Sequence, residues 1–261
     1  MSSQDAPSRA AAFFDLDRTL MAGSSGLHWA RAAYRAGLIS RRRIVGDIWA
    51  NLQFRLRGST DEETEELKAR LGTWLAGRRV KDLERLSPAV LAGVLPRLYP
   101  AMLQAAYDHQ DAGRPVYICT AASQGTADML AHVLGFEGAV GSPLEERGGY
   151  YTGRFGGTFC YAEGKPERMR ELAAAHGLDL GASWAYSDSA SDIPMLRAVG
   201  HPVAVNPDAE LGRVAATEGW DVLRFETLGR RVKIATAVVA TAAAGSVGRT
   251  VVARRAASSS S

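Results

Sequence analysis

The segment 11–20, AAFFDLDRTL, constrains the fold more than any other part of the chain. It opens with a short apolar run, 11–14, and turns polar at Asp15, Asp17 and Thr19. A short apolar run that ends in turn-forming polar residues is typical of a buried strand whose carboxyl end reaches the surface. In open α/β sheets, ligands bind at the carboxyl ends of the strands. We therefore expect a strand here, with a ligand site at its end.

The two aspartates predict a cation at this strand end. The period of two in a strand places Asp15 and Asp17 on the same side. Neighbouring carboxylates repel each other, and a bound divalent cation relieves that repulsion. Taken alone, the pattern fits equally well an ordinary strand end whose acidic side chains are solvated or cap the next helix. The rest of the chain has to decide between the two interpretations.

The composition is that of a soluble globular protein. Hydrophobic residues make up 46% of the 261 residues and charged residues 23%, enough for one large core, alone or with a smaller domain. The formal net charge is only +3 and the arginines are scattered, so no nucleic-acid partner is predicted. Two cysteines are too few for a disulfide framework. The opening MSSQDAPSRA lacks the apolar core of a secretory signal, so we expect a cytoplasmic protein.

Residues 27–95 carry only helix signals. Helical patterns begin near Leu27, Ser40 and Thr60, and Thr60 followed by Glu63 is a capping-box signature. A purely helical block after the first strand of an α/β chain predicts a separate lid over 27–95.

Strand and helix signals alternate in the remainder of the chain, which implies a parallel sheet with crossover helices. We expect the catalytic core to comprise 11–26 and 96–228. The elements predicted within it are a helix over 96–112, strands at 116–119, 184–187, 202–205 and 222–223, a hairpin over 146–158, and helices ending near 134 and spanning 164–176.

The tail, 229–261, differs in composition from the rest. Its alanine-rich run, 234–248, is flanked by arginine and lysine. A helix of that length spans roughly 22 Å, less than the ~30 Å hydrocarbon core of a bilayer. Packing on the core is the favoured interpretation, and weak contact with a membrane surface or with a second copy of the chain is the alternative. We expect the last residues to be disordered, and the sequence does not set the oligomeric state.

Chemistry-bearing residues fall at several strand ends. Strands are predicted to end at Asp15, Thr120 and Asp188, and Lys165 stands at a helix start. In a parallel sheet these ends lie along one edge, so the four residues can meet. Acidic oxygens hold a hard cation, a carboxylate can attack, and a hydroxyl with an ammonium can hold an anion. Phosphoryl transfer needs this combination of charge neutralisation, positioning and an in-line nucleophile.

With these motifs in this order, the sequence resembles the haloacid dehalogenase superfamily of phosphatases, subfamily IB, near its phosphoserine-phosphatase-like branch. The matching motifs are DLDRT at 15–19, Thr120, Lys165 and DSASD at 188–192. The resemblance covers about residues 11–225. It implies an α/β fold with a Rossmann-like core, a central parallel sheet and an inserted all-helical cap of the C1 type. It also implies a Mg²⁺-dependent phosphomonoesterase acting on a small phosphorylated metabolite.

The resemblance also implies the reacting groups and the metal ligands. Asp15 would be the nucleophile that forms an aspartyl-phosphate, and Asp17 would protonate the leaving oxygen and then activate water. The Asp15 carboxylate, the Asp17 backbone carbonyl and Asp188 would hold Mg²⁺.

Thr120 and Lys165 would bind the remaining phosphate oxygens. Asp192 would orient Lys165 or the water shell of the metal, and Thr19 would brace the turn. Simpler alternatives are a solvated lysine at Lys165, a helix cap at Thr120, and an Asp192 that only caps its own helix.

The substrate is less constrained. Phosphoserine enzymes of the family carry a glutamate nine residues after the nucleophile, where this chain has Ser24. That departure counts against phosphoserine itself. Ser24, Ser25 and His28 are candidates for lining the cap side of the pocket, although cap packing is the favoured interpretation for His28.

Two other functions stay open at this point. A phosphotransferase would pass the phosphoryl group to an alcohol instead of water. A non-catalytic regulatory module on the same fold, associated with a membrane through 234–248, is disfavoured by the intact set of catalytic residue types.

Overall fold

The computed structural model describes residues 9–40 and 61–225. By its contacts the chain divides into a compact unit, Met1–Leu223, and a second unit, Arg224–Ser261, of which only Arg224 and Phe225 are described. Every element described below belongs to the first unit.

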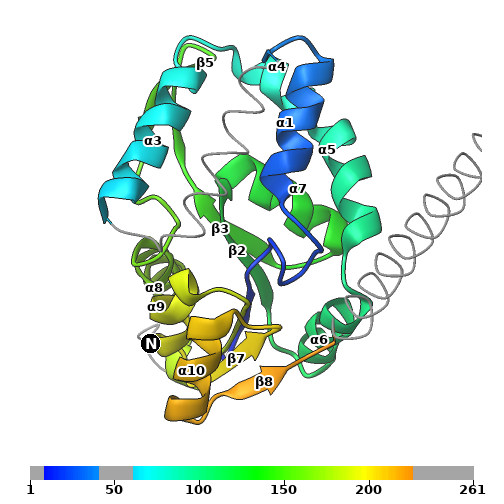
Figure 1. Ribbon diagram of the computed structural model, residues 1–261, viewed down its shortest axis with the longest axis vertical. Coiled ribbons are helices and arrows are strands. Elements are labelled where there is room, and N and C mark those ends of the chain that lie inside the picture. Colours follow the sequence, from blue (N-terminus) through cyan, green and yellow to red (C-terminus); the bar gives the residue numbers. More distant parts are fainter. Residues whose placement is uncertain (1–8, 41–60, 226–261) are drawn as a thin grey trace, which may run out of the picture. The chain divides into compact units, whose positions relative to one another are not determined.

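A parallel sheet of six strands forms the centre of this unit (Figure 1). The order is β3-β2-β1-β6-β7-β8, so the strand order runs outward in both directions from β1, which is the switch point where α/β sheets bind ligands. The predicted α/β fold with a central parallel sheet is confirmed. The strands are β1 (Ala12–Phe14), β2 (Val116–Ser123), β3 (Gly138–Ser142), β6 (Trp184–Ser187), β7 (His201–Val205) and β8 (Asp221–Leu223).

Strand β1 is buried on both faces. Phe13 belongs to a hydrophobic cluster that includes Met169, whereas Phe14 stacks on Tyr186 with ring centroids 4.3 Å apart and meets His109 edge-on. Because successive side chains of a strand point to opposite faces, a continuous apolar run is what a strand covered on both sides requires. This covering fixes the carboxyl end of β1 firmly in the middle of the sheet.

Helices connect the strands, and the described part of the segment between β1 and β2 holds four further helices. The helix predicted over 96–112 is broken, because Pro96 lies in a short 3-10 turn, Leu95–Arg97, and Pro100 starts a new helix at a position that proline favours. The connecting helices are α6 (Pro100–Asp111), α7 (Gln124–Leu134), α8 (Gly164–His176), α9 (Ile193–Arg197) and α10 (Ala209–Glu218). The four helices that the structure describes between β1 and α6, here called the inserted helices, are α1 (Ser25–Arg35), α3 (Asp61–Leu75), α4 (Val80–Glu84) and α5 (Ser87–Val94).

A hairpin of β4 (Leu144–Arg147) and β5 (Tyr150–Phe155) forms where the sequence predicted one. It bonds through main-chain atoms to the segment that connects α3 and α4. Gly77 N donates to Tyr151 O (2.9 Å), and Tyr151 N donates to Arg78 O (2.9 Å). The hairpin therefore continues into the connection between α3 and α4.

Two glycines set the distance between α3 and the hairpin. A Cβ on Gly72 would lie 2.2 Å from Gly153 O, and one on Gly153 would lie 2.6 Å from Gly72 O. Real Cβ atoms do not approach a carbonyl oxygen this closely, and Gly153 also has a φ of +86°. Helix and strand can pack this tightly only because both positions lack a side chain.

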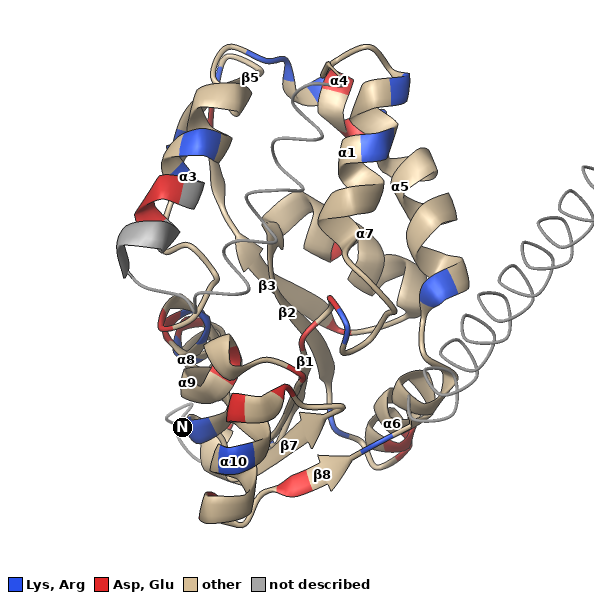
Figure 2. Cartoon of the chain, viewed as in Figure 1, with Lys and Arg blue, Asp and Glu red and all other residues tan. Residues whose placement is uncertain are grey.

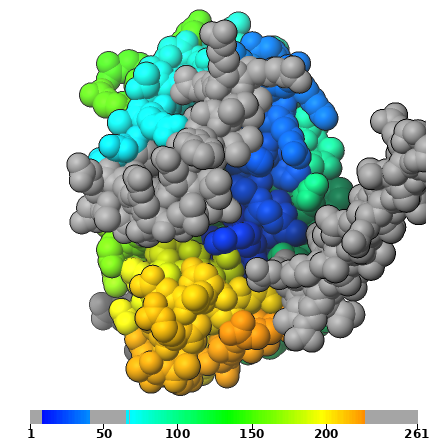
Figure 3. Space-filling view, viewed as in Figure 1, coloured from blue at the N-terminus to red at the C-terminus, as the bar shows by residue number. Residues whose placement is uncertain are grey.

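The carboxyl ends of the central strands carry the acidic residues of interest. Figure 2 shows acidic residues in the loop after β1 and in the segment before α9, close to one another. On the face shown in Figure 3, the blue segment that leads from β1 into α1 reaches the surface beside the yellow segment that contains α9. This edge of the sheet is the one at which a ligand site was predicted.

Two predictions concern parts of the chain that the structure does not describe. The helix expected near Ser40 and the run 234–248 lie outside the described residues. Within 9–40 and 61–225, no helix is both long and apolar enough to cross a membrane. The division into a core (11–26 and 96–228), a cap (27–95) and a tail (229–261) stays a prediction.

Candidate active site

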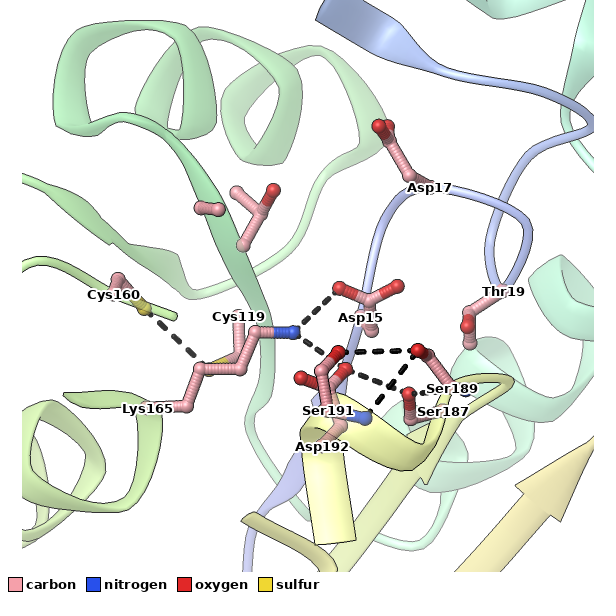
Figure 4. Close-up of polar contacts among 12 residues, drawn as sticks. Asp15, Asp17, Thr19, Cys119, Cys160, Lys165, Ser187, Ser189, Ser191 and Asp192 are labelled. Atoms are coloured by element: carbon pink, nitrogen blue, oxygen red, sulfur yellow. Dashed lines mark hydrogen bonds and ion pairs between the residues drawn. The ribbon is translucent and has the colours of Figure 1, made fainter. Parts of the chain in front are cut away.

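Lys165 joins two aspartates that are far from it in sequence. It lies in the first turn of α8 and is buried, not solvated. Its Nζ donates to Asp15 Oδ1 at 2.6 Å and to Asp192 Oδ2 at 2.7 Å (Figure 4). Asp15 directly follows β1, and Asp192 precedes α9. The structure thus brings together three of the predicted site residues. Together with Asp188 they are called the carboxylate cluster below.

Asp188 follows β6, next to β1 in the sheet, and completes the cluster. Its Oδ2 pairs with Arg18 Nη2 at 2.8 Å, and its Oδ1 accepts a hydrogen bond from Thr19 Oγ1 at 3.4 Å. Arg18 adopts a left-handed backbone conformation, with φ of 65°, in the turn after β1. Thr19, expected to brace the turn, therefore reaches across to a predicted metal ligand.

Burial raises the pKa values of Asp15 and Asp188 toward neutrality. Burial raises the pKa of Asp15 to about 8; the Lys165 ammonium opposes the rise, and the carboxylates of Asp192 and Asp188 add to it. Burial likewise raises the pKa of Asp188 to about 6, against the effect of Arg18. Burial favours neutral Lys165, but Asp15 and Asp192 outweigh it and raise the pKa of Lys165 above its ordinary value.

A serine missed by the sequence analysis supports Asp192. Ser187, the buried last residue of β6, donates its hydroxyl hydrogen bond to Asp192 Oδ2 at 2.6 Å. The Asp192 side chain makes no capping bond to its own helix, which removes the simpler alternative for it. The sequence signal is the hydroxyl-rich SDSASD itself, in which the motif singles out only the aspartates as site residues.

Asp208 was also missed, and it holds the loop that begins at Asp188. Its backbone N–H donates to Asp188 O (3.0 Å), and its Oδ2 accepts from Ala190 N (2.9 Å). Its other oxygen caps α10. The sequence signal is an Asn-Pro-Asp before a helix, which predicts a cap but not its second contact.

The expected convergence of Asp17 on Asp15 was wrong. β1 ends at Phe14, and the chain turns at Leu16, before Asp17, so the period of two does not extend that far. The Asp17 carboxylate points away from Asp15 and Lys165 (Figure 4). It accepts hydrogen bonds from Ser24 Oγ (2.7 Å) and Ser25 N (2.8 Å), at the start of α1.

The predicted pocket residues therefore have other partners in this structure. Ser24 and Ser25 bond to Asp17, which places them beside a predicted catalytic residue. His28 packs on α5, where a Cβ on Gly93 would lie 2.3 Å from His28 Nδ1. Burial, assisted by Arg97 and Arg31, lowers the pKa of His28. Packing of His28 within the inserted helices agrees with the interpretation favoured from the sequence.

Thr120 lies in β2, the other neighbour of β1. Its buried hydroxyl accepts a hydrogen bond from Ala122 N (3.3 Å). The side chain that caps α7 is Ser123, not Thr120. The preceding residue, Cys119, is buried beside Cys160 with a sulfur–sulfur distance of 3.9 Å, and both are free thiols.

The cluster suits a hard cation. Three buried carboxylates, Asp15, Asp188 and Asp192, face two cationic groups, Lys165 and Arg18. Carboxylate oxygens short of positive charge are the ligands that Mg²⁺ prefers. No group of three or more His, Cys, Asp or Glu side chains within the described residues is arranged as a metal site. The predicted ligand set, two carboxylates with a backbone carbonyl, is compatible with that finding because the third ligand is not a side chain.

Comparison with known proteins agrees with this geometry. The sequence model of the haloacid dehalogenase-like hydrolase family matches residues 12–197. A Mycobacterium tuberculosis protein named phosphoserine phosphatase is 34% identical over 91% of this chain and 79% of its own length. A Neisseria meningitidis protein named histidinol-phosphatase is 32% identical over 82% of this chain and 98% of its own length. A Bordetella pertussis crystal structure of unknown function superposes with a TM-score of 0.72 at 30% identity, covering 83% of this chain and 98% of that one.

Proposed function

This chain belongs to the haloacid dehalogenase-like hydrolase family and is a phosphatase of that family, and from this premise we propose how it works. We propose that it hydrolyses phosphate monoesters of small metabolites through a phosphorylated Asp15, with Mg²⁺ bound at the carboxylate cluster. The observation that carries the proposal is the contact of buried Lys165 with both Asp15 and Asp192.

Asp15 is suited to attack phosphorus. One of its oxygens, Oδ1, is held by Lys165, which orients the carboxylate and leaves Oδ2 for bond formation. As Oδ2 bonds to phosphorus, the bond from phosphorus to the ester oxygen breaks. The Lys165 ammonium also lies where it can neutralise a phosphate oxygen, with Thr120 on the neighbouring strand as a second phosphate ligand.

The departing oxygen needs a proton, which we assign to Asp17. Its carboxylate bonds to Ser24 and Ser25 in this structure, so a rotation of the side chain toward Asp15 precedes the transfer. Asp17 then takes a proton from the water that attacks phosphorus, which releases phosphate and regenerates Asp15.

Mg²⁺ would be held by the carboxylates of Asp15 and Asp188 and the Asp17 backbone carbonyl. When bound, it neutralises charge on the phosphate and on the clustered carboxylates. Asp192, with Ser187 behind it, keeps Lys165 in place.

The substrate class follows from the relatives and from Ser24. The two relatives are named for different substrates at nearly equal identity, 34% and 32%, so their names do not select one ester. Ser24 occupies the position of the phosphoserine-binding glutamate and is engaged by Asp17. We therefore propose a small phosphorylated metabolite other than phosphoserine. Cytoplasmic location, the absence of a nucleic-acid partner and any contact through 234–248 stay predictions.

The test is a screen of the purified protein with Mg²⁺ against phosphoserine, phosphocholine, histidinol phosphate and lysophosphatidate. Asp15→Asn should lower turnover at least about 10³-fold, because the amide cannot form the covalent intermediate. Asp111→Asn, at the exposed end of α6, is the matched control and should keep the wild-type rate. Retained turnover in Asp15→Asn, or activity that survives chelation of the metal, would contradict the proposal.

A further inference from the structure

Arg18 makes a contact that the proposed function does not use. Its Nη2 lies 2.8 Å from Asp188 Oδ2, and its side chain is 38% exposed whereas that of Asp188 is 7% exposed. The guanidinium therefore reaches from the surface onto a buried carboxylate. No sequence motif predicts a function for Arg18.

The charges around Asp188 make this contact significant. Lys165 is committed to Asp15 and Asp192, and the ion pair that the described residues give Asp188 is the one with Arg18. Thr19 bonds to the other Asp188 oxygen. Both oxygens of a predicted metal ligand are thus engaged by neighbours from the turn after β1.

The permanent positive charge of Arg18 beside a metal ligand disfavours binding of a metal cation there. The two charges repel each other, and within a buried site this repulsion is only weakly screened. The guanidinium also bonds to an oxygen that the metal would use. Because Arg18 is partly exposed, its side chain can swing toward solvent when a cation binds, and return when the cation leaves.

We propose that Arg18 is a built-in counter-ion that competes with Mg²⁺ for Asp188 and thereby weakens the affinity of the site for the metal. This inference rests on the proposed function, since it assumes that Asp188 is a metal ligand. Its consequence is that occupancy of the site follows the free Mg²⁺ concentration instead of being permanent. Arg18 acts here as a tuning residue of the metal site and takes no part in bond making.

The experiment measures Mg²⁺ binding by calorimetry at pH 8 in the full-length protein, without substrate. Arg18→Gln removes the charge and leaves a shorter polar side chain, and should lower the Kd for Mg²⁺ about tenfold or more. Arg18→Lys keeps the charge and should stay within about threefold of wild type. Arg35→Gln, an exposed arginine in the last turn of α1, is the matched control and should leave the Kd unchanged.

The possible outcomes separate this inference from the proposed function. An equal or higher Kd for Arg18→Gln, while wild type binds Mg²⁺, overturns the competition and leaves the metal site standing. If neither wild type nor Arg18→Gln binds Mg²⁺, both the competition and the proposed metal site are overturned. If Arg18→Gln does not fold, as judged by circular dichroism, Arg18→Met takes its place with the same expected tighter binding. Asp188→Asn should abolish binding in every background, which ties the measured heat to this site.

Discussion

Two polar clusters contact strands β1 and β6. They differ in how many charged groups they bring together. The carboxylate cluster lies at the carboxyl ends of the strands, where its three acids face Lys165 and the neighbouring Arg18. The second, here called the histidine cluster, comprises His109, Arg114 and Tyr186 and lies against α6. The first brings five ionisable groups of both signs together, whereas the second carries one formal charge, on Arg114, and bonds both ring nitrogens of His109.

Hydrogen bonds in the histidine cluster fix the tautomer of His109. Arg114 Nε donates to His109 Nδ1 at 2.7 Å, and since arginine cannot accept, Nδ1 carries the lone pair. The ring proton therefore lies on Nε2 and is donated to Tyr186 Oη at 2.8 Å. The Arg114 guanidinium also lies over the Trp184 ring, 4.5 Å from its centroid. The network holds a neutral imidazole with both nitrogens bonded.

The pKa values of the two clusters shift in opposite directions relative to neutral pH. Burial lowers the pKa of His109 to about 4, with help from Arg114, and raises that of Tyr186 to about 12, so both groups move away from neutral pH. Asp15 and Asp188, at about 8 and about 6, move toward it. Strongly perturbed pKa values are typical of functional sites, whereas groups locked in one form are suited to support. The comparison predicts that substitutions in the first cluster affect turnover and those in the second affect stability.

The largest effect should follow from Lys165→Gln, which leaves Asp15 and Asp192 without their cation. We expect turnover to fall at least about 10³-fold, and the free energy of unfolding to fall by about 3–5 kcal/mol because buried carboxylates lose their partner. Lys165→Gln combined with Asp192→Asn should recover part of the stability and none of the turnover. Assays with p-nitrophenyl phosphate and urea unfolding measure both quantities, with exposed Lys81→Gln as control. Recovery of turnover in the double variant would break the comparison.

The next largest effect concerns His109, which should make the free energy of unfolding depend on pH. Its folded pKa, about 4, lies below the ordinary 6.5, so its neutral form is favoured by folding. This contribution is complete above pH 6.5 and is lost as pH falls toward 4, by on the order of 3 kcal/mol at most. His109→Gln should flatten the difference between unfolding free energies at pH 7 and pH 4.5. The raised pKa values of Asp15 and Asp188 act in the opposite sense, but equally in both proteins. An unchanged pH profile would show that His109 is not held neutral.

A smaller effect is expected from Tyr186→Phe, which removes the acceptor of the His109 proton and keeps the ring stacked on Phe14. An unsatisfied buried donor costs about 1–2 kcal/mol of unfolding free energy. Turnover should stay within about twofold, since the Tyr186 side chain lies outside the carboxylate cluster. Tyr107→Phe, at an exposed position of α6, should change neither quantity. A loss of turnover larger than tenfold in Tyr186→Phe would show that the two clusters are coupled.

The carboxylate cluster was largely predictable from sequence, and the histidine cluster was not. Asp15, Lys165 and Asp188 follow strand ends or start a helix, and parallel topology brings such ends to one edge. His109 and Arg114 carry no motif. Their meeting with Tyr186 depends on how α6 packs against β6, which local patterns do not encode.

The errors at the site have a similar origin. The orientation of Asp17 depends on where the strand ends: β1 stops at Phe14 and the chain turns at Leu16, so the strand alternation no longer holds at Asp17. A left-handed turn follows at Arg18, which is rare for a residue with a side chain and has no sequence signature here. The contact of Arg18 with Asp188 depends on the same turn. Strand β3 was missed because Gly138–Ser142 is rich in small residues and lacks the β-branched and aromatic pattern of a typical strand.

The glycine contact between α3 and β5 limits how this enzyme can be re-engineered. Gly72 and Gly153 come from segments separated by the whole of β2 and α7, yet neither position accepts even a methyl group. Anyone who builds a chimera by transplanting the inserted helices from a relative must transplant the hairpin with them. A graft that exchanges only one of the two would set a new side chain against a carbonyl oxygen.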